Sequence, residues 1–280
     1  MLTSELIQKI ENFVYEKPRS IQEIAKLIGK NWRTADRYIN EIAKDRGTLA
    51  VRTFREGTRG ALKIIYWSSI EKRSANIFQE DLEKQIFNGR DKQHFSAFDI
   101  YQHIENKNKT AYAKAVKDEN AMGKIPEFRK FLESAKTQIL IFSGNLSFIN
   151  YKDEEGSVFD ILDKLVKKEV QIKVVCRVDI SGIENIKKLL SLNQKYAKEL
   201  VEIRHKEQPL RLTLIDSKTF NMKDIFNPTQ REKELGKKTI AFYTVKDKKW
   251  AEWLKNIFFK MFNNSIIAQK RIEEIEKVFK

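Results

Sequence analysis

The sequence has little of several residue types, and each shortage excludes a class of protein. Its 280 residues hold one cysteine, which can form no disulfide within the chain, and three histidines without the spacing of a zinc site. Cys176 lies inside an apolar run, as expected of a buried thiol in an intracellular protein. No stretch approaches the roughly 20 apolar residues of a membrane span, and the N-terminus lacks a signal-peptide pattern. The sequence therefore predicts a cytoplasmic protein with no metal, cofactor or membrane partner.

Proline and glycine are also scarce, with four and ten residues, so regular helices and strands are expected. Hydrophobic residues make up 41% of the chain, which is enough for two domains with separate cores at this length. Acidic residues are outnumbered, with 39 Asp and Glu against 54 Lys and Arg, for a net charge of +15. Such a charge attracts phosphates without sequence preference. Whether it indicates a nucleic-acid-binding surface therefore depends on where the basic residues lie along the chain.

The first 70 residues carry three helical patterns. Apolar residues at helical spacing predict helices over 4–15, 21–28 and 32–44. Ser4 is expected to cap the first helix, and Ser20 with Glu23 to form a capping box on the second. Gly29 ends the second helix, and Asn31 is expected to cap the third. The second and third helices, joined by a short turn with a glycine, are typical of a helix-turn-helix.

A hairpin pattern follows the third helix. Residues 49–54 alternate in polarity, residues 57–60 form a glycine-containing turn, and residues 61–67 return. With this order of elements, residues 3–68 resemble the winged helix-turn-helix family. The resemblance implies that the third helix lies in the major groove of DNA, with its N-terminal residues nearest the base edges.

Basic and polar residues gather on the outer faces of this unit. Residues 26–63 hold ten Lys and Arg against four Asp and Glu. Arg33 and Arg37 are one helical turn apart and can reach guanine edges or phosphates. The expected DNA contacts are Trp32, Arg33, Thr34, Arg37 and Asn40 on the helix, and Arg52, Arg55, Arg59 and Lys63 on the hairpin. Trp32 fits packing at the helix start equally well.

The rest of the chain divides into three further regions. Residues 70–124 are expected to form a helical connector with no core of its own. From residue 125, helices alternate with strands predicted at 138–142, 170–177, 201–204, 211–215 and 239–245. Residues 125–265 thus form an α/β domain with a mixed sheet between helices, and residues 266–280 form a C-terminal helix. The fold class is α/β with an N-terminal winged helix of α+β type at residues 1–69.

In element order and in several short strings, residues 125–265 resemble phospholipase D-type domains. The strings lie at 139–147, 201–205 and 210–218, and the C-terminal part of TrmB-type archaeal transcriptional regulators is similar. The catalytic motif of the phospholipase D family is His-x-Lys, then four residues and Asp, in which the histidine attacks phosphorus.

Aligned on Asp216, this sequence reads Pro209-Leu210-Arg211, so proline stands where the nucleophile is expected. His205 lies four residues too early to replace it. The resemblance therefore implies a catalytically inactive domain in which Arg211 can still hold an anion. Because single-motif members resemble half of a pseudo-symmetric pair, it also implies a homodimer.

These patterns together predict a dimeric transcriptional regulator that binds double-stranded DNA. Its phospholipase D-like domain would serve dimerisation or the sensing of an effector that the sequence does not specify. One alternative is a nuclease or phosphodiesterase directed to DNA by the winged helix, against which Pro209 speaks. Another is an adaptor whose winged helix docks onto a protein assembly.

Overall fold

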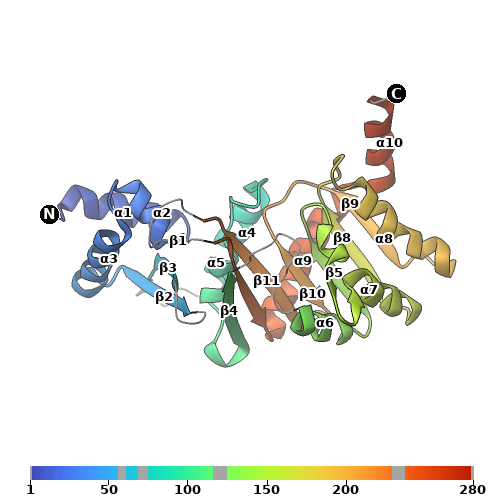
Figure 1. The fold of residues 1–280 in the computed structure, drawn as a ribbon, viewed down its shortest axis with the longest axis horizontal. Helices are drawn as coiled ribbons and strands as arrows, with labels where there is room; N and C mark the ends of the chain where they lie inside the picture. The colour runs from blue at the N-terminus through green and yellow to red at the C-terminus, as the bar shows by residue number, and fades with distance from the viewer. Residues whose placement is uncertain (1, 56–60, 69–74, 116–124, 229–236, 279–280) are drawn as a thin grey trace.

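The computed structural model describes residues 2–55, 61–68, 75–115, 125–228 and 237–278. The molecule is elongated, with a smaller N-terminal part at one end and a larger part built on an eight-stranded sheet (Figure 1). The elements of the smaller part are α1 (Ser4–Glu16), β1 (Arg19–Ser20), α2 (Ile21–Leu27), α3 (Trp32–Arg46), β2 (Leu49–Arg55) and β3 (Ala61–Trp67). The three predicted helices and the two strands of the hairpin are confirmed.

Local hydrogen bonds begin α2 and α3 where the sequence predicts. The Ser20 hydroxyl accepts the backbone amide of Glu23 at 3.3 Å, and the Glu23 carboxylate accepts the amide of Ser20 at 2.7 Å. This is the predicted capping box. The Asn31 side chain accepts the amide of Thr34 at 2.9 Å and so caps α3. Gly29, with φ of 63°, takes the left-handed conformation expected after a helix.

The cap predicted for α1 is wrong by one residue. Thr3, rather than Ser4, has extended backbone angles, and its hydroxyl accepts the amide of Leu6 at 3.3 Å. Both residue types cap helices well, so composition alone does not separate them. The helix begins with Ser4 as its first residue because Thr3 places its hydroxyl opposite the third amide that follows it.

The hairpin of β2 and β3 has two buried faces. Strand β1 pairs with the free edge of β3, which gives a three-stranded sheet in the order β1-β3-β2. On one face Leu49 and Ile65 join the core of the smaller part. The other residues of that core come from α1, the start of α2 and α3: Ile10, Val14, Ile21, Ile24, Ala25, Ala35, Ile39 and Ile42. The opposite face carries Phe54, Leu62 and Ile64, which belong to the core of the larger part.

The larger part contains helices on both sides of its sheet. The helices are α4 (Ala75–Asn88), α5 (Ala97–Gln102), α6 (Ile125–Glu133), α7 (Val158–Lys167), α8 (Ile183–Tyr196), α9 (Lys248–Asn263) and α10 (Ala268–Val278). The sheet strands are β4 (Lys109–Ala115), β5 (Gln138–Phe142), β8 (Gln171–Cys176), β9 (Val201–His205), β10 (Leu212–Ile215), β11 (Thr219–Phe226), β12 (Thr239–Val245) and β13 (Ile266–Ile267). The larger part also contains short turns of 3₁₀ helix at Asn106–Asn108 and Ser147–Asn150. A two-stranded ribbon is formed by β6 (Lys152–Asp153) and β7 (Gly156–Ser157).

The sheet is mixed, with strand order β13-β9-β8-β5-β10-β11-β12-β4. Strands β5, β8 and β9 are parallel to one another, and the other neighbours are antiparallel. One hydrophobic core lies between the sheet and helices α4, α5 and α9, and a second lies between the opposite face and helices α6, α7, α8 and α10. The predicted mixed sheet flanked by helices is therefore confirmed (Figure 1). Within the described ranges, no helix is long and apolar enough to cross a membrane.

Three strands of the eight-stranded sheet, β4, β11 and β13, were not expected from the sequence. The region predicted as a helical connector contains β4, an edge strand whose polar sequence, Lys-Thr-Ala-Tyr-Ala-Lys-Ala, hides its pairing with β12. Strand β11 alternates buried and partly exposed residues, but Asp224 occupies one of the buried positions and interrupts the apolar pattern. Ile266 and Ile267, predicted as the start of the last helix, instead pair with β9. The two edge strands, β4 and β13, are set by long-range pairing that no local pattern encodes.

A shared core fixes the hairpin to the larger sheet. The ring centroids of Phe54 on β2 and Tyr243 on β12 lie 6.3 Å apart, edge to face. Tyr66 on β3 meets Phe98 on α5 at 4.9 Å. Such aromatic pairs add to the free energy gained by burying apolar area. The hairpin thus serves as a structural element of both parts.

We expect Phe54→Ala to destabilise both parts together. Phe54 is 6% exposed, and truncating a buried phenylalanine typically costs about 3–5 kcal/mol. Chemical denaturation followed by circular dichroism should show one transition shifted to lower denaturant. The matched control is Tyr15→Ala, because Tyr15 is 63% exposed and its only expected loss is its edge contact with Trp67, about 1.5 kcal/mol at most. Equal effects of the two variants would contradict the shared core.

Candidate functional site

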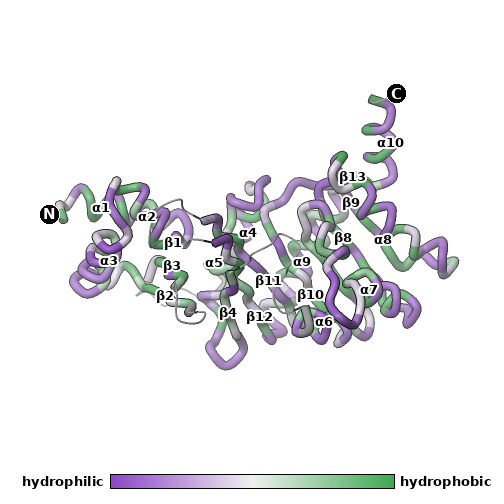
Figure 2. The backbone as a smooth tube through the Cα atoms, in the orientation of Figure 1, coloured by the Kyte–Doolittle hydropathy of each residue, from purple (hydrophilic) through white to green (hydrophobic). Residues whose placement is uncertain are grey.

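The predicted DNA-contacting residues of α3 lie on its outer face. Arg33, Arg37 and Asn40 are exposed, whereas Ala35 and Ile39 face the core of the smaller part. The helix is largely hydrophilic along its length and lies at the end of the molecule remote from the larger sheet (Figures 1 and 2). The structure therefore brings these three polar side chains onto one accessible helix.

The two arginines of this face are held by neighbouring rings. The guanidinium carbon of Arg33 lies 5.7 Å from the Trp32 ring, and that of Arg37 lies 5.3 Å from the Tyr38 ring. Among the described residues, neither guanidinium is within ion-pair distance of a carboxylate. Trp32 itself is half-buried and packs against the core of the smaller part. This placement favours the packing role that the sequence left open for Trp32.

The predicted contacts on the hairpin lie on its two opposite faces, with Lys63 beside α3 and Arg52 on the other side. Lys63 is bound to Asp36, with Nζ 2.6 Å from a carboxylate oxygen, so its charge is neutralised within the unit. Arg52 is exposed, but it lies on the Phe54 face of the hairpin. Burial, and then the charge of Arg52, lower the pKa of Lys109 on β4 to about 8. Arg52 therefore points toward the larger part.

The remaining predicted DNA contacts, Thr34, Arg55 and Arg59, do not add to the exposed surface that the structure describes. The half-buried Thr34 contributes its backbone amide to the Asn31 cap. Arg59 lies outside the described residues, and so does the side chain of Arg55. The surface that the structure supports as a candidate nucleic-acid interface consists of Arg33, Arg37 and Asn40, and we call it the α3 face.

Arg211, the residue expected to hold an anion, lines a cavity of about 300 Å³. The cavity lies where β5 ends and β10 begins, with β11 along one side. Its polar wall combines cations with uncharged groups: Lys92, Ser143, Asn145, Ser147, Arg177, Arg211, Thr213, Asn221 and Lys223. None of the described side chains that line it is acidic. We call it the cationic pocket.

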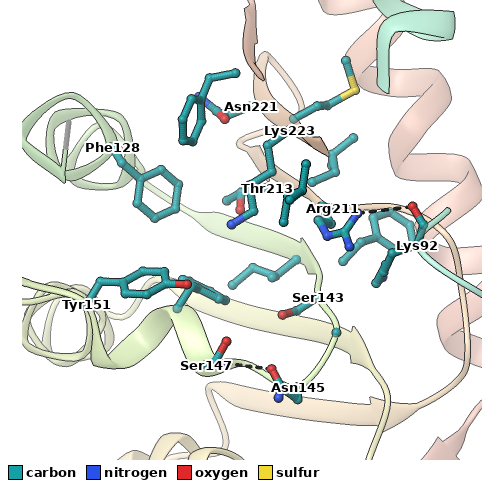
Figure 3. Close-up of a pocket in the computed structure, with 18 of the residues that line it drawn as sticks. Lys92, Phe128, Ser143, Asn145, Ser147, Tyr151, Arg211, Thr213, Asn221 and Lys223 are labelled. Carbon is teal, nitrogen blue, oxygen red and sulfur yellow. Dashed lines mark hydrogen bonds between the residues drawn. The ribbon is translucent and has the colours of Figure 1, made fainter. Parts of the chain in front are cut away.

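Lys92 and Arg211 hold each other in place on one side of this pocket (Figure 3). The Arg211 guanidinium donates to the backbone carbonyl of Lys92 at 3.2 Å. The ammonium of Lys92 donates to the carbonyl of Leu210 at 2.5 Å. The opposite wall is aromatic, with Phe128 and Tyr151 facing across the cavity (Figure 3). A ligand with an anionic end and an apolar end matches these two walls.

Burial and mutual repulsion disfavour the charged forms of the pocket lysines. Burial, followed by the charge of Arg211, lowers the pKa of Lys92 well below its usual value. The same two causes lower the pKa of Lys223 to about 8. Arg177 is balanced by Asp179, with Nε 2.6 Å from the carboxylate. An anion bound between Lys92, Arg211 and Lys223 would relieve this repulsion.

Sequence reasoning found Arg211 but missed Lys92 and Lys223. Lys223 belongs to the unpredicted strand β11, and Lys92 comes from the segment after α4, more than 100 residues away from Arg211 along the chain. Pro209, in place of the expected histidine, packs against Gly89, where an added Cβ would stand 2.7 Å from the proline ring. This close approach brings the segment that carries Lys92 to the pocket.

His205 and Asp216, the other two residues considered for the phospholipase D motif, both accept hydrogen bonds from the backbone. His205 does not line the pocket, and its Nδ1 accepts the backbone amide of Val178 at 2.9 Å. The Asp216 carboxylate accepts the amides of Lys136, Thr137 and Gln138 at 2.9–3.0 Å. It thereby fixes the turn before β5. In the described ranges, no three His, Cys, Asp or Glu residues are grouped as metal ligands.

No protein-family model matches this sequence, and no curated protein matches it. Among solved structures, Nuc from Salmonella typhimurium, a phospholipase D family member, is 13% identical over 57% of this chain and 97% of that chain, with a TM-score of 0.39. TrmBL2, described as an archaeal chromatin protein with a novel mode of DNA binding, is 11% identical over 94% of each chain, with a TM-score of 0.40. Phosphatidylserine synthase from Haemophilus influenzae is 8% identical over 98% of this chain and 90% of that chain, with a TM-score of 0.43. Likenesses this distant do not establish a family.

We expect Asp216→Asn to reduce stability in a pH-dependent way. Burial alone would raise the pKa of Asp216, but the hydrogen bonds from Gln138, Thr137 and Lys136 outweigh it and hold the pKa below its ordinary value. A depressed pKa in the folded state stabilises the fold above the unfolded pKa, and this stability is lost as pH falls through the folded pKa. The variant should cost about 1.5–3 kcal/mol near pH 7.

Urea denaturation at several pH values measures this cost. The difference between the natural chain and the variant should shrink below about pH 4, where the carboxylate becomes protonated. Asparagine tolerates the left-handed backbone of this position, where φ is 49°, so the change isolates the charge. A difference independent of pH would contradict the role assigned to the carboxylate.

Proposed function

We propose that this protein is a dimeric transcriptional regulator that binds double-stranded DNA through a winged helix formed by α1, α2, α3 and the β2–β3 hairpin. The observation that carries this proposal is the α3 face, on which two arginines and an asparagine project from a helix whose other side is buried. The larger sheet would then be a phospholipase D-like domain that senses a ligand and joins two copies.

The α3 face has the chemistry for reading DNA. Arginine can bond two acceptors of guanine in the major groove, and asparagine can bond adenine in the same way. Arg33 and Arg37 are one turn apart, a spacing that reaches neighbouring positions along the groove. Asp36, the one acidic residue between them, is bound to Lys63. Repulsion of DNA phosphates by that carboxylate is therefore weakened.

We further propose that the larger part does not cleave phosphodiesters by the phospholipase D mechanism. The mechanism needs a histidine nucleophile beside the phosphate. Pro209 stands at that position, and the His205 ring lies outside the pocket with one nitrogen engaged by Val178. These contacts support binding without covalent catalysis, and they weigh against the nuclease alternative.

The proposed dimer is supported by one edge of the larger sheet. Strand β13 forms that edge, and Ile266 and Ile267 on it are 43% and 50% exposed. Exposed edge strands with apolar residues are ready to pair with another chain. Because α3 and β13 lie at opposite ends of the molecule (Figures 1 and 2), a dimer through this edge would carry one α3 face at each end, and a palindromic site would need half-sites separated by several helical turns. Sedimentation velocity should give twice the 33.0 kDa chain mass, and a persistent monomer would contradict it.

We expect Arg33→Gln/Arg37→Gln to weaken DNA binding by at least about fivefold for each arginine. A guanine contact made by an arginine is worth about 1–3 kcal/mol, and a phosphate contact lowers the salt slope by about one when it is lost. Selection from random-sequence DNA, followed by titrations at several salt concentrations, measures both effects. The natural chain should select a palindromic motif that the variant does not.

A matched control removes two charges from the opposite end of the molecule. Lys167→Gln/Lys168→Gln changes exposed residues at the end of α7, remote from α3 (Figure 1), and should leave the selected motif unchanged. Weak binding that selects no motif and falls equally in both variants would reduce the interaction to net charge. The adaptor alternative would then be favoured.

A further inference from the structure

The cationic pocket gathers its charges from four separate elements. Lys92 follows α4, Arg177 follows β8, Arg211 precedes β10, and Lys223 lies on β11. Long-range folding therefore brings like charges together at a place where they repel one another. Arg177 is paired with Asp179, whereas Lys92 and Arg211 donate to backbone carbonyls. Since none of the described side chains that line the pocket is acidic, a bound anion is the simplest partner for Lys92 and Arg211.

The number of cations indicates which anion fits. A carboxylate carries one negative charge, whereas a phosphate monoester carries about −1.5 to −2 at pH 7 and three strong acceptor oxygens. The planar guanidinium of Arg211 can donate two parallel hydrogen bonds to phosphate oxygens, and Lys92 supplies a point charge beside it. The neighbouring amide and hydroxyl groups, on Asn145, Asn221 and Ser143, add uncharged partners.

The opposite wall selects the organic part of the ligand. Phe128, Phe148, Tyr151 and Phe242 line it, together with Ile225. Phe128 and Phe148 meet edge to face at 6.2 Å, so the wall offers ring faces and edges already in place. At about 300 Å³ the cavity is at the small end of pockets that hold organic ligands.

We propose that the cationic pocket binds a small phosphate monoester whose organic part contains a ring, and that this ligand regulates DNA binding. The phosphate lies between Lys92, Arg211 and Lys223, and the ring lies against Phe128 and Tyr151. The regulatory half of this proposal rests on the DNA-binding function proposed above.

The residues that follow Lys92 and Lys223 in the sequence make hydrogen bonds that connect the pocket to the smaller part. Gln93 follows Lys92, and its backbone carbonyl accepts a hydrogen bond from the ammonium of Lys17, between α1 and β1. Asp224 follows Lys223, and its carboxylate accepts the amide of Ala97 at 2.9 Å and the hydroxyl of Ser96 at 2.8 Å. Asp224 thus holds the start of α5.

Helix α5 then contacts the hairpin directly. Phe98 on α5 lies 4.9 Å from Tyr66 on β3, ring centroid to ring centroid. A ligand that draws Lys92 and Lys223 together moves residues joined to α1, to α5 and through α5 to the hairpin. The pocket and the α3 face are therefore connected through packed and hydrogen-bonded groups.

Calorimetry with three small probes tests the ligand class on the full chain. Phenyl phosphate carries both the ring and the phosphate, benzoate keeps the ring with a single charge, and inorganic phosphate lacks the ring. We expect phenyl phosphate to bind at least about tenfold more tightly than either of the others. Benzoate binding as tightly as phenyl phosphate, or no binding of phenyl phosphate, would overturn the proposal.

Substitutions of pocket residues test whether phenyl phosphate binds in the cationic pocket. Arg211→Gln should abolish binding of phenyl phosphate and inorganic phosphate alike, whereas Lys168→Gln, an exposed lysine outside the lining, should change neither. Phe128→Ala should weaken phenyl phosphate at least fivefold and leave inorganic phosphate unchanged. This second variant keeps the test decisive if Arg211→Gln fails to fold, which circular dichroism would reveal. Unchanged binding of phenyl phosphate by Phe128→Ala would overturn the orientation of the ligand.

The regulatory half is tested by titrating the selected DNA with and without saturating phenyl phosphate. We expect the Kd for DNA to change at least about fivefold, the lower end of typical allosteric couplings, and to stay constant in Arg211→Gln. An unchanged Kd in the natural chain would overturn the coupling. If the chain binds no DNA at all, the proposed function fails, while the calorimetric result still decides the ligand class.

Discussion

The double-sided burial of the β2–β3 hairpin is the constraint on which the rest of the structure depends. One face of the hairpin completes the small core under α1, α2 and α3, and the other face, through Phe54 and Ile64, completes the core under α5 and α9. A hairpin used in this way cannot separate from either part without exposing apolar area to water. The α3 face is consequently held at a fixed position relative to the larger sheet.

The same constraint connects the cationic pocket to the proposed DNA-binding surface. Its cations are costly to bring together, and the fold offsets part of that cost with hydrogen bonds from Lys92 and Arg211 to backbone carbonyls. Asp224 sits one residue from the pocket and caps the helix that supports the hairpin. Burial raises the pKa of Asp224, although hydrogen bonds from α5 oppose that shift. A buried carboxylate in this position is explained by its role as a support for α5.

Local chemistry made much of the fold predictable. The Ser20–Glu23 box, the Asn31 cap and the apolar spacing of α3 are encoded within a few residues, and the five strands expected in the larger part are short runs that are apolar or that alternate apolar with polar residues. Strand β4 was missed because its polar residues are accommodated by pairing with β12, which lies far away in sequence, and β11 was missed because polar residues, Asp224 among them, interrupt its apolar pattern. Lys92 carries no local signal, since its contacts with Leu210 and Arg211, far away in sequence, place it in the pocket. The Asp36–Lys63 pair likewise joins residues whose proximity depends on how the hairpin folds onto α3.

Chemical footprinting of arginines is the most direct test of the central claim that DNA lies on the α3 face. The chain is modified with phenylglyoxal in the presence and absence of its selected DNA, and each arginine is quantified by mass spectrometry. Arg33 and Arg37 are exposed and should be modified in the free protein and protected in the complex, while Arg177, at the cationic pocket, should be modified equally in both. Protection of Arg177 with continued modification of Arg33 and Arg37 would place the DNA on the larger part and contradict this account.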